Sequence, residues 1–207
     1  MSSTETQLDT IRLLEECSMS PTVFAAQTQL DGVPFEPTNP QYHFYLIAER
    51  ADHLVVTKAR QVGITEAAVR YLLWKAIFKG ETSLYFAPNI GMAEHAAELT
   101  LKAYRSLPGW MRSVIAPPLI MSRRQFVLDN GAAINFGAAN LAAACGASAH
   151  NIFIDEAAFC TSDDFFYSIM PIMHMAHKTI IASSLNKKGD RFDQFRTELL
   201  CMYPEAE

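Results

Sequence analysis

The spacing of apolar residues changes along the chain, and from residue 53 onward it predicts strands that alternate with helices. Four short runs are apolar throughout, as expected of strands buried on both faces of a sheet: residues 54–56, 83–86, 152–154 and 179–182. Residues 64–72 and 89–106 carry apolar side chains at helical spacing, with Asn89 as an N-terminal cap. The pattern predicts an α/β fold with a central, mostly parallel sheet flanked by helices. Such sheets bind ligands beyond the carboxyl ends of their strands.

Residues 1–40 are expected to form a small N-terminal appendage, and residues 41–207 an α/β core. The elements predicted in the appendage are a short amphipathic helix at 8–15 and two strands at 22–30 and 33–36. Asp31-Gly32 between these strands is typical of a tight hairpin turn, and the prolines up to Pro40 indicate a loop. The core is completed by an antiparallel pair at 126–128 and 133–136 and a polar helix from Asp190.

Composition and charge narrow the function classes. The chain has 207 residues, half of them apolar, which is the composition of a globular protein with one good-sized domain. Its net charge is −5, whereas a compact domain that grips DNA alone is usually basic. Any DNA contact must therefore come from a local basic patch or from several subunits together. We find no secretory signal, no membrane-spanning stretch and no CxxC pair, so a zinc site or a disulfide framework is not indicated.

A phosphate-binding loop is predicted after the first strand. Such a loop needs backbone N–H groups, a helix N-terminus, a nearby cation and a hydroxyl group for magnesium. The segment that can supply them consists of Lys58, Ala59, Arg60, Gln61, Val62, Gly63, Ile64 and Thr65. Gly63 allows close backbone approach and Thr65 offers the hydroxyl. Ile64 stands where the standard pattern has lysine, so the cation must be Lys58 or Arg60. Taken alone, the segment also fits a basic strand-to-helix turn.

Two acidic residues follow the apolar run at 152–154. Asp155 is suited to holding magnesium, and Glu156 to polarising an attacking water. Acids at a surface turn after a core strand would look the same. The functional interpretation gains strength because the pair follows the phosphate loop with a strand-helix unit between them.

Small polar residues follow the run at 179–182. They are Ser183, Ser184 and Asn186. These side chains can sense the γ-phosphate and pass its state to a neighbouring segment, although turn-forming residues in a loop would also explain them. If all three segments serve one site, the strands ending at Thr57, Asp155 and Ser183 must lie side by side.

The three segments, in this order, resemble the ATPase domain of the large terminase subunit of tailed bacteriophages. The family's deviant Walker A loop has the form RQxG, present here in KARQVGIT at 58–65, and its Walker B box, IDEAAF, stands at 154–159. Residues 183–186 are similar to its coupling motif, with Leu185 in place of proline, and Gln41 matches its adenine-reading glutamine.

The resemblance implies a P-loop NTPase of the ASCE class that hydrolyses ATP with Mg²⁺ and pumps double-stranded DNA into a procapsid. It implies nucleotide contacts from Gln41, the loop 58–65, Ser183, Ser184 and Asn186, magnesium held by Thr65 and Asp155, and catalysis by Glu156, Arg60 and Lys58. The implied partners are double-stranded DNA, the portal protein, the small terminase subunit and further copies of the chain in a ring, a pentamer, on the capsid. The expected location is the host cytoplasm.

Full-length large terminases continue into an RNase H-like nuclease domain, for which the 207 residues leave no room, so we expect no nuclease activity from this chain. Two other functions fit the same motifs. A helicase-like translocase shares the ATP chemistry, and strand separation would identify it. A degenerate P-loop module that docks on a portal or small subunit without hydrolysing ATP is consistent with Ile64 in the lysine position. A phosphate-release assay would separate it from the others.

Overall fold

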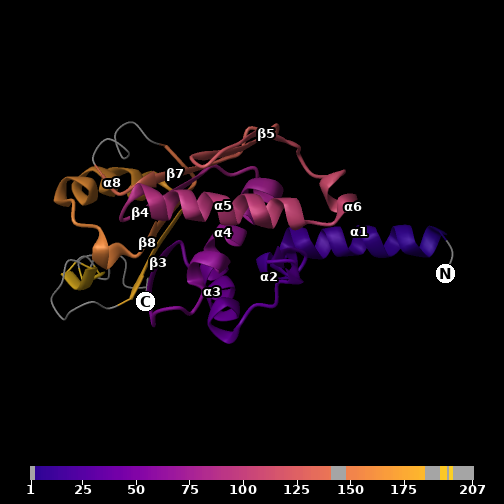
Figure 1. The fold of residues 1–207 in the computed structure, drawn as a ribbon, viewed down its shortest axis with the longest axis horizontal. Coiled ribbons are helices and arrows are strands. Elements are labelled where there is room, and N and C mark those ends of the chain that lie inside the picture. The colour runs from indigo at the N-terminus through magenta and orange to yellow at the C-terminus, as the bar shows by residue number, and fades with distance from the viewer. Residues whose placement is uncertain (1–2, 141–147, 185–191, 195, 198–207) are drawn as a thin grey trace.

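Seven strands form a mixed sheet with helices on both faces (Figure 1). The computed structural model describes residues 3–140, 148–184, 192–194 and 196–197. The helices are α1 (Ser3–Met19), α2 (Pro21–Ala25), α3 (Asn39–Arg50), α4 (Ile64–Trp74), α5 (Ile90–Ser106), α6 (Gly109–Arg112) and α8 (Asp163–Met175), with a π-helix at Lys75–Lys79 and a 3-10 turn at Ala157–Phe159. The strands are β1 (Gln29–Leu30), β2 (Val33–Pro34), β3 (His53–Lys58), β4 (Ser83–Ala87), β5 (Pro118–Met121), β6 (Gln125–Leu128), β7 (Ala133–Ala138), β8 (Asn151–Asp155) and β9 (Lys178–Ser184).

The strand order in the sheet is β3-β9-β8-β4-β7-β6-β5. The pairings from β3 to β7 are parallel, and the pairings β7–β6 and β6–β5 are antiparallel. This confirms the mostly parallel sheet and the antiparallel pair predicted from the sequence. The strands that carry Thr57, Ser183 and Asp155 are neighbours, with β9 between β3 and β8, so the three sequence segments meet at one edge of the sheet.

Successive residues of the central strands alternate between two hydrophobic clusters. Tyr85 and Phe153 lie in the cluster that contains α4 and α5, whereas Leu84, Ile152 and Ile154 lie in the cluster that contains α8. Strands β4 and β8 are buried along their whole length. The continuous apolar runs in the sequence are therefore explained by burial on both faces.

The strand predicted at 22–30 is wrong over its first part. Residues 21–25 form α2, because Ser20 caps the helix through its side chain and Pro21 fits the first helical turn. The turn itself is confirmed: Asp31 and Gly32 have φ of 50° and 85° and join the two-residue strands β1 and β2.

The loop predicted up to Pro40 is wrong at its end, because α3 begins at Asn39. Proline has no N–H to leave unsatisfied in the first turn, so Pro40 fits there without interrupting the helix. Thr38 and Gln41 form a capping box, in which the Gln41 side chain accepts a hydrogen bond from the Thr38 backbone N–H at 2.9 Å.

The N-terminal segment packs on the α/β core. Cys17, Phe24 and Phe35 belong to the same hydrophobic cluster as α4, and the Trp74 indole donates to the Cys17 carbonyl oxygen at 2.7 Å. Figure 1 shows α1 extending outward from this contact to the N-terminus. The domain boundary between residues 40 and 41 stays a prediction.

Two further expectations concern parts of the chain on which the structure gives little or nothing. The polar helix expected from Asp190 lies mostly outside the described residues, and of that stretch 192–194 and 196–197 are helical. Among the helices that the structure describes, none is both long enough and apolar enough to cross a membrane.

Candidate functional site

The phosphate loop connects the end of β3 to the start of α4. Gly63 is the residue before α4, and its φ of 75° is a left-handed conformation that glycine adopts without the steric cost of a side chain. Gln61, with φ of 61°, is also left-handed. The loop therefore turns sharply and presents the N-terminus of α4, where backbone N–H groups attract anions.

Gln41 locks this turn from the side of α3. Its Nε2 donates to the Gly63 carbonyl oxygen at 2.9 Å, and its Oε1 accepts from the backbone N–H and the hydroxyl of Thr38 at 2.9 and 3.2 Å. The side chain is almost fully buried. Gln41 thus lies beside the loop, and its amide holds the backbone there. The predicted contact of Gln41 with adenine stays a prediction.

Thr65 and Asp155 meet although they are 90 residues apart. The Thr65 hydroxyl donates to Asp155 Oδ2 at 2.6 Å, while the Glu156 backbone N–H donates to Asp155 Oδ1 at 3.0 Å. A hydroxyl and one carboxylate at a helix N-terminus fit a magnesium ion, which usually takes one or two protein ligands and completes its shell with phosphate oxygens and water. Within the described ranges there is no cluster of three or more acidic, His or Cys side chains that would form a self-contained metal cage.

Sequence reasoning missed Tyr85, whose hydroxyl also donates to Asp155 Oδ2, at 2.7 Å. Burial and the adjacent Asp155 carboxylate raise the pKa of Tyr85 well above its usual value, so the phenol stays protonated at neutral pH. A tyrosine inside a strand predicted to be buried was the available signal, because a buried phenol needs a hydrogen-bond partner.

Lys58 and Glu156 form an ion pair across the same site, with 2.6 Å between Lys58 Nζ and Glu156 Oε1. The other carboxylate oxygen, Oε2, accepts from the backbone N–H and hydroxyl of Ser184 at 3.3 and 3.2 Å. Burial alone would raise the pKa of Glu156, but the bond and charge of Lys58 and the bonds from Ser184 outweigh it and lower that pKa. Glu156 has a left-handed backbone, with φ of 47°, which is uncommon for a residue with a side chain.

Ser183 connects the third segment to the turn after the acidic pair. Its hydroxyl accepts from the Ala158 backbone N–H at 3.0 Å and donates to the Ser184 carbonyl oxygen at 3.1 Å. Both serines are buried. Asn186, the other residue expected in this segment, lies outside the described residues.

Arg60 is exposed, and its guanidinium lies 5.9 Å from the centre of the Phe159 ring. Two adjoining cavities of about 300 and 330 Å³ open at this edge of the sheet. Their lining residues are Arg60, Gln61, Pro88, Met92, Glu156, Phe159 and Ser184 for the first, and Thr65, Tyr85, Asn89, Gly91, Met92, His95, Asp155 and Glu156 for the second. The side chains of Arg60, Thr65, Asp155 and Glu156 therefore border open space, whereas Lys58 lines a different cavity, between α3 and β3.

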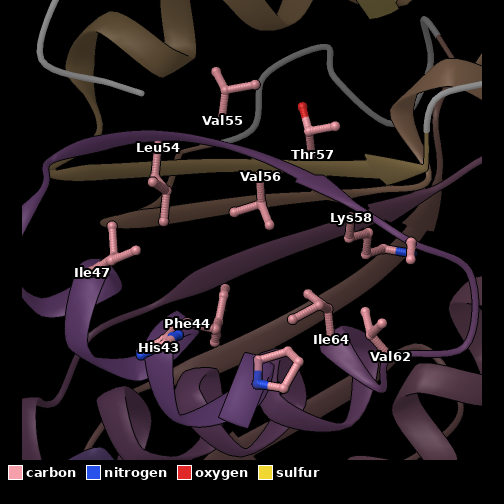
Figure 2. Close-up of a pocket in the computed structure, with 12 residues that line it drawn as sticks. His43, Phe44, Ile47, Leu54, Val55, Val56, Thr57, Lys58, Val62 and Ile64 are labelled. Carbon is pink, nitrogen blue, oxygen red and sulfur yellow. The ribbon is translucent and has the colours of Figure 1, made fainter.

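Ile64, in the position of the usual lysine, points away from that space. It is buried, and it lines an apolar cavity of about 360 Å³ between α3 and β3, together with Phe44 and Val62 (Figure 2). Ala59 lines the same cavity. The side chains of Ile64, Val62 and Ala59 therefore face this cavity, so these residues would contact the nucleotide through backbone atoms. The cations of the loop are Lys58 and Arg60.

Comparisons with known proteins agree with this geometry. The family described as terminase large subunit, T4likevirus-type, N-terminal matches residues 55–195, more than half of the chain. No curated protein matches this chain. The fold is similar to that of a mutant form of the large terminase ATPase domain of Thermus phage P74-26, with 17% identity and a TM-score of 0.62 over 78% of this chain and 70% of that one.

The large terminase of bacteriophage HK97 is also similar, with 16% identity and a TM-score of 0.72. The match covers 91% of this chain but 42% of the HK97 protein. The large terminase of another thermophilic bacteriophage matches at 11% identity with a TM-score of 0.54, over 75% of this chain and 39% of that one. The chain therefore belongs to the T4likevirus-type family of terminase large subunits, whose N-terminal part it matches.

Proposed function

We propose that the chain binds ATP with Mg²⁺ between the loop 58–65 and Asp155, and that hydrolysis moves double-stranded DNA into a procapsid. The observation that carries the site assignment is the pair of contacts Thr65–Asp155 and Lys58–Glu156, at 2.6 Å each, which join the first two sequence motifs. Both contacts lie beside open cavities at the carboxyl edge of the sheet, where ligands bind in folds of this class.

The loop binds phosphate through backbone and charge. Gln41 and the left-handed Gly63 fix the backbone at the N-terminus of α4, which favours negative charge. Lys58, at the end of β3, is the loop cation that already touches the acidic pair, through its ammonium and Glu156. Charge neutralisation of this kind contributes much of the catalysis of phosphoryl transfer.

Thr65 and Asp155 would hold magnesium, which when bound offsets phosphate charge and polarises the phosphate oxygens. The Thr65 proton already goes to Asp155, so the lone pairs of the hydroxyl oxygen remain for the metal. Asp155 is almost fully buried and accepts three hydrogen bonds, which keep its carboxylate oriented.

Glu156 would orient the attacking water. Its carboxylate contacts Lys58 and Ser184 in the structure. Phosphate oxygens compete for the Lys58 ammonium, so phosphate binding would release Glu156 Oε1 for the water. While Lys58 is in contact, the lowered pKa of Glu156 keeps the carboxylate ionised. An ionised carboxylate can accept a hydrogen bond from the water.

Arg60 and the serines complete the proposal. The planar guanidinium of Arg60 faces the cavity next to Glu156 and suits contact with the transition state or with a neighbouring subunit. Ser184 contacts Glu156, and Ser183 contacts Ala158, so a movement of Glu156 would be transmitted to β9. This is a direct path from the phosphate site to the predicted coupling segment, in which Asn186 is also expected to act.

The proposed partners follow from membership of the terminase family. They are double-stranded DNA, the portal protein, the small terminase subunit and other copies of the chain in a pentameric ring, in the cytoplasm of the infected host. Because the net charge is −5, we expect weak, salt-sensitive DNA binding by the isolated chain and stronger binding by several copies. The expectation that these 207 residues do not cut DNA stays a prediction, which incubation of plasmid with the pure protein and Mg²⁺ would test.

The test is phosphate release by the purified chain with and without duplex DNA, with Glu156→Gln as the reference. Mg²⁺-dependent release that the variant lacks would support the proposal. ATP binding without release would identify a docking module, and ATP-dependent strand separation a helicase-like translocase. Absence of ATP binding would overturn the assignment of the site.

A further inference from the structure

The phenol of Tyr85 makes a bond that none of the three sequence motifs contains. Tyr85 belongs to β4, is 1% exposed, and donates to Asp155 Oδ2 at 2.7 Å. It lines the same cavity as Thr65 and Asp155. A fully buried hydroxyl at the carboxylate expected to serve magnesium must either stabilise the fold or set the geometry of that carboxylate.

The sheet aims this hydroxyl at Asp155. Tyr85 is the register partner of Phe153 in the parallel pair β4–β8, and their rings stack at 5.4 Å with an interplanar angle of 15°. Asp155 follows Phe153 by two residues and therefore lies on the same face of β8. On the other side, Phe136 of β7 packs on the Tyr85 ring at 5.6 Å. The ring is held between two aromatic neighbours, so its oxygen has little freedom to move.

The hydrogen bonds of Asp155 show why this oxygen matters. A carboxylate only accepts, and a phenol has one proton, so Tyr85 is the donor. Oδ2 receives Tyr85 and Thr65, and Oδ1 receives the Glu156 backbone N–H. If the Tyr85 hydroxyl were removed, Thr65 would be the one of these side chains that still donates a hydrogen bond to Asp155. In the proposed site the Thr65 oxygen must also bind the metal.

We infer that Tyr85 is a positioning residue for magnesium: its hydroxyl fixes Asp155 in the rotamer that Thr65 and the metal shell require. The inference rests on the proposed function. Groups that orient metal-binding side chains typically change metal affinity by about 10- to 100-fold when removed.

The experiment compares Tyr85→Phe with Tyr71→Phe. Both variants delete one hydroxyl and keep the ring. Tyr71 is a matched control because it is also buried and its hydroxyl also donates to a carboxylate, Glu49 Oε1, at 2.7 Å, outside the phosphate site. ATP affinity is measured by calorimetry in EDTA and in Mg²⁺, and Mn²⁺ binding to the ADP complex is measured by electron paramagnetic resonance. Thermal unfolding reports the stability of each variant.

We expect Tyr85→Phe to bind ATP in EDTA within about twofold of the parent and to lose about 10-fold or more in Mn²⁺ affinity and in the gain that Mg²⁺ brings. Tyr71→Phe should lower the stability without changing the Mn²⁺ affinity. Equal metal dependence in parent and Tyr85→Phe would overturn the inference, and so would an equal loss in Tyr71→Phe. A parent that binds ATP no better with Mg²⁺ would instead overturn the proposed magnesium site, and the inference with it.

A second variant guards against a Tyr85→Phe protein too unstable to purify. Phe153→Leu keeps the phenol but removes the ring on which it stacks, so it should weaken Mn²⁺ binding measurably, though by less than about tenfold. Asp155→Asn completes a cycle: once the carboxylate is gone, Tyr85→Phe should change Mn²⁺ binding no further. Additive losses in that double variant would argue that Tyr85 acts independently of Asp155.

Discussion

The side-chain amide of Gln41 occupies the space where a Cβ atom of Gly63 would stand, and it donates to the Gly63 carbonyl oxygen at 2.9 Å. The two residues come from α3 and from the phosphate loop, 22 positions apart. Gly63 is thus required twice, once by its left-handed φ of 75° and once by the close approach of Gln41. Gln41, whose contact with adenine stays a prediction, thus holds the backbone of the loop proposed to bind phosphate.

These two requirements can be separated by mutation. Gly63→Ala should lower the free energy of unfolding by about 2–3 kcal/mol, because it adds both backbone strain and a clash with Gln41. Gly80→Ala is the matched control, since Gly80 has a similar φ of 65° and nothing within 4 Å of its Cβ position, and should cost about 1 kcal/mol. Urea denaturation gives both values.

The excess cost of Gly63→Ala should largely disappear when Gln41→Ala is present, because the clash is then removed and only the strain remains. If the two effects simply add in the double variant, Gln41 does not constrain Gly63 and the proposed lock is wrong.

The cation that replaces the missing lysine is the subject of the next prediction. Lys58→Ala should weaken ATP binding about 10-fold or more and also lower turnover, because it removes the ammonium beside the phosphate site. Arg60→Ala should lower turnover by about 100-fold and change binding little, since its exposed guanidinium suits the transition state. Glu156→Gln should bind ATP and hydrolyse almost none. Calorimetry and phosphate release measure the two properties, and parental turnover by Lys58→Ala would exclude Lys58 as the cation.

The ion pair Lys58–Glu156 makes a prediction about pH. The folded pKa of Glu156 lies below its usual 4.5, so the pair contributes stability above about pH 4.5, and that stability is lost as the pH falls through the folded pKa. Lys58→Met should lower the free energy of unfolding by about 2 kcal/mol at about pH 7, a value between those of exposed and buried pairs. Its difference from the parent should shrink as the pH falls below about 4.5, as denaturation at each pH would show. In a Glu156→Gln background, the effect of Lys58→Met on the free energy of unfolding should not vary with pH. If the effect is also independent of pH in the parent background, Glu156 is not the group that pairs with Lys58.

The sequence predicted the parts of the fold that depend on local pattern. The strands β3, β4, β8 and β9 contain continuous apolar runs, and burial of the central strands on both faces explains why the runs were visible. The same runs placed Asp155 and Glu156 at a strand end. The motifs also predicted that the strands ending at Thr57, Asp155 and Ser183 lie side by side. The order of the seven strands in the sheet was not predicted.

Features that depend on tertiary contacts could not be predicted in the same way. Residues 22–25 were interpreted as part of a strand and Pro40 as part of a loop, but they lie in α2, which Ser20 caps, and in α3, which has a Thr38–Gln41 capping box. Tyr85 looked like a core residue, because its hydrogen bond to Asp155 depends on the register of β4 with β8. The burial of Ile64 likewise depends on α3, which the sequence did not reveal.

Arg70 ties the N-terminal segment to the core. Its guanidinium is buried and donates to the Thr28 hydroxyl at 2.8 Å, the Gln29 carbonyl oxygen at 3.0 Å and the Glu66 carboxylate. It also lies 3.9 Å from the centre of the Phe35 ring. The hairpin β1–β2 is therefore held to α4 by one buried cation that donates to several acceptors. Removing this cation takes a hydrogen-bond donor away from each of them.

We predict that Arg70→Met lowers the free energy of unfolding by about 3–5 kcal/mol, because a buried, multiply bonded charge is lost. The exposed pair Lys102–Asp31, 3.7 Å apart, joins the same hairpin to α5 and provides the control: Lys102→Met should cost about 1 kcal/mol or less. Urea denaturation measures both, and limited proteolysis should cut the Arg70→Met protein first near the hairpin. Equal, small effects of the two substitutions would mean that apolar packing of Cys17 and Phe24 alone holds the N-terminal segment in place.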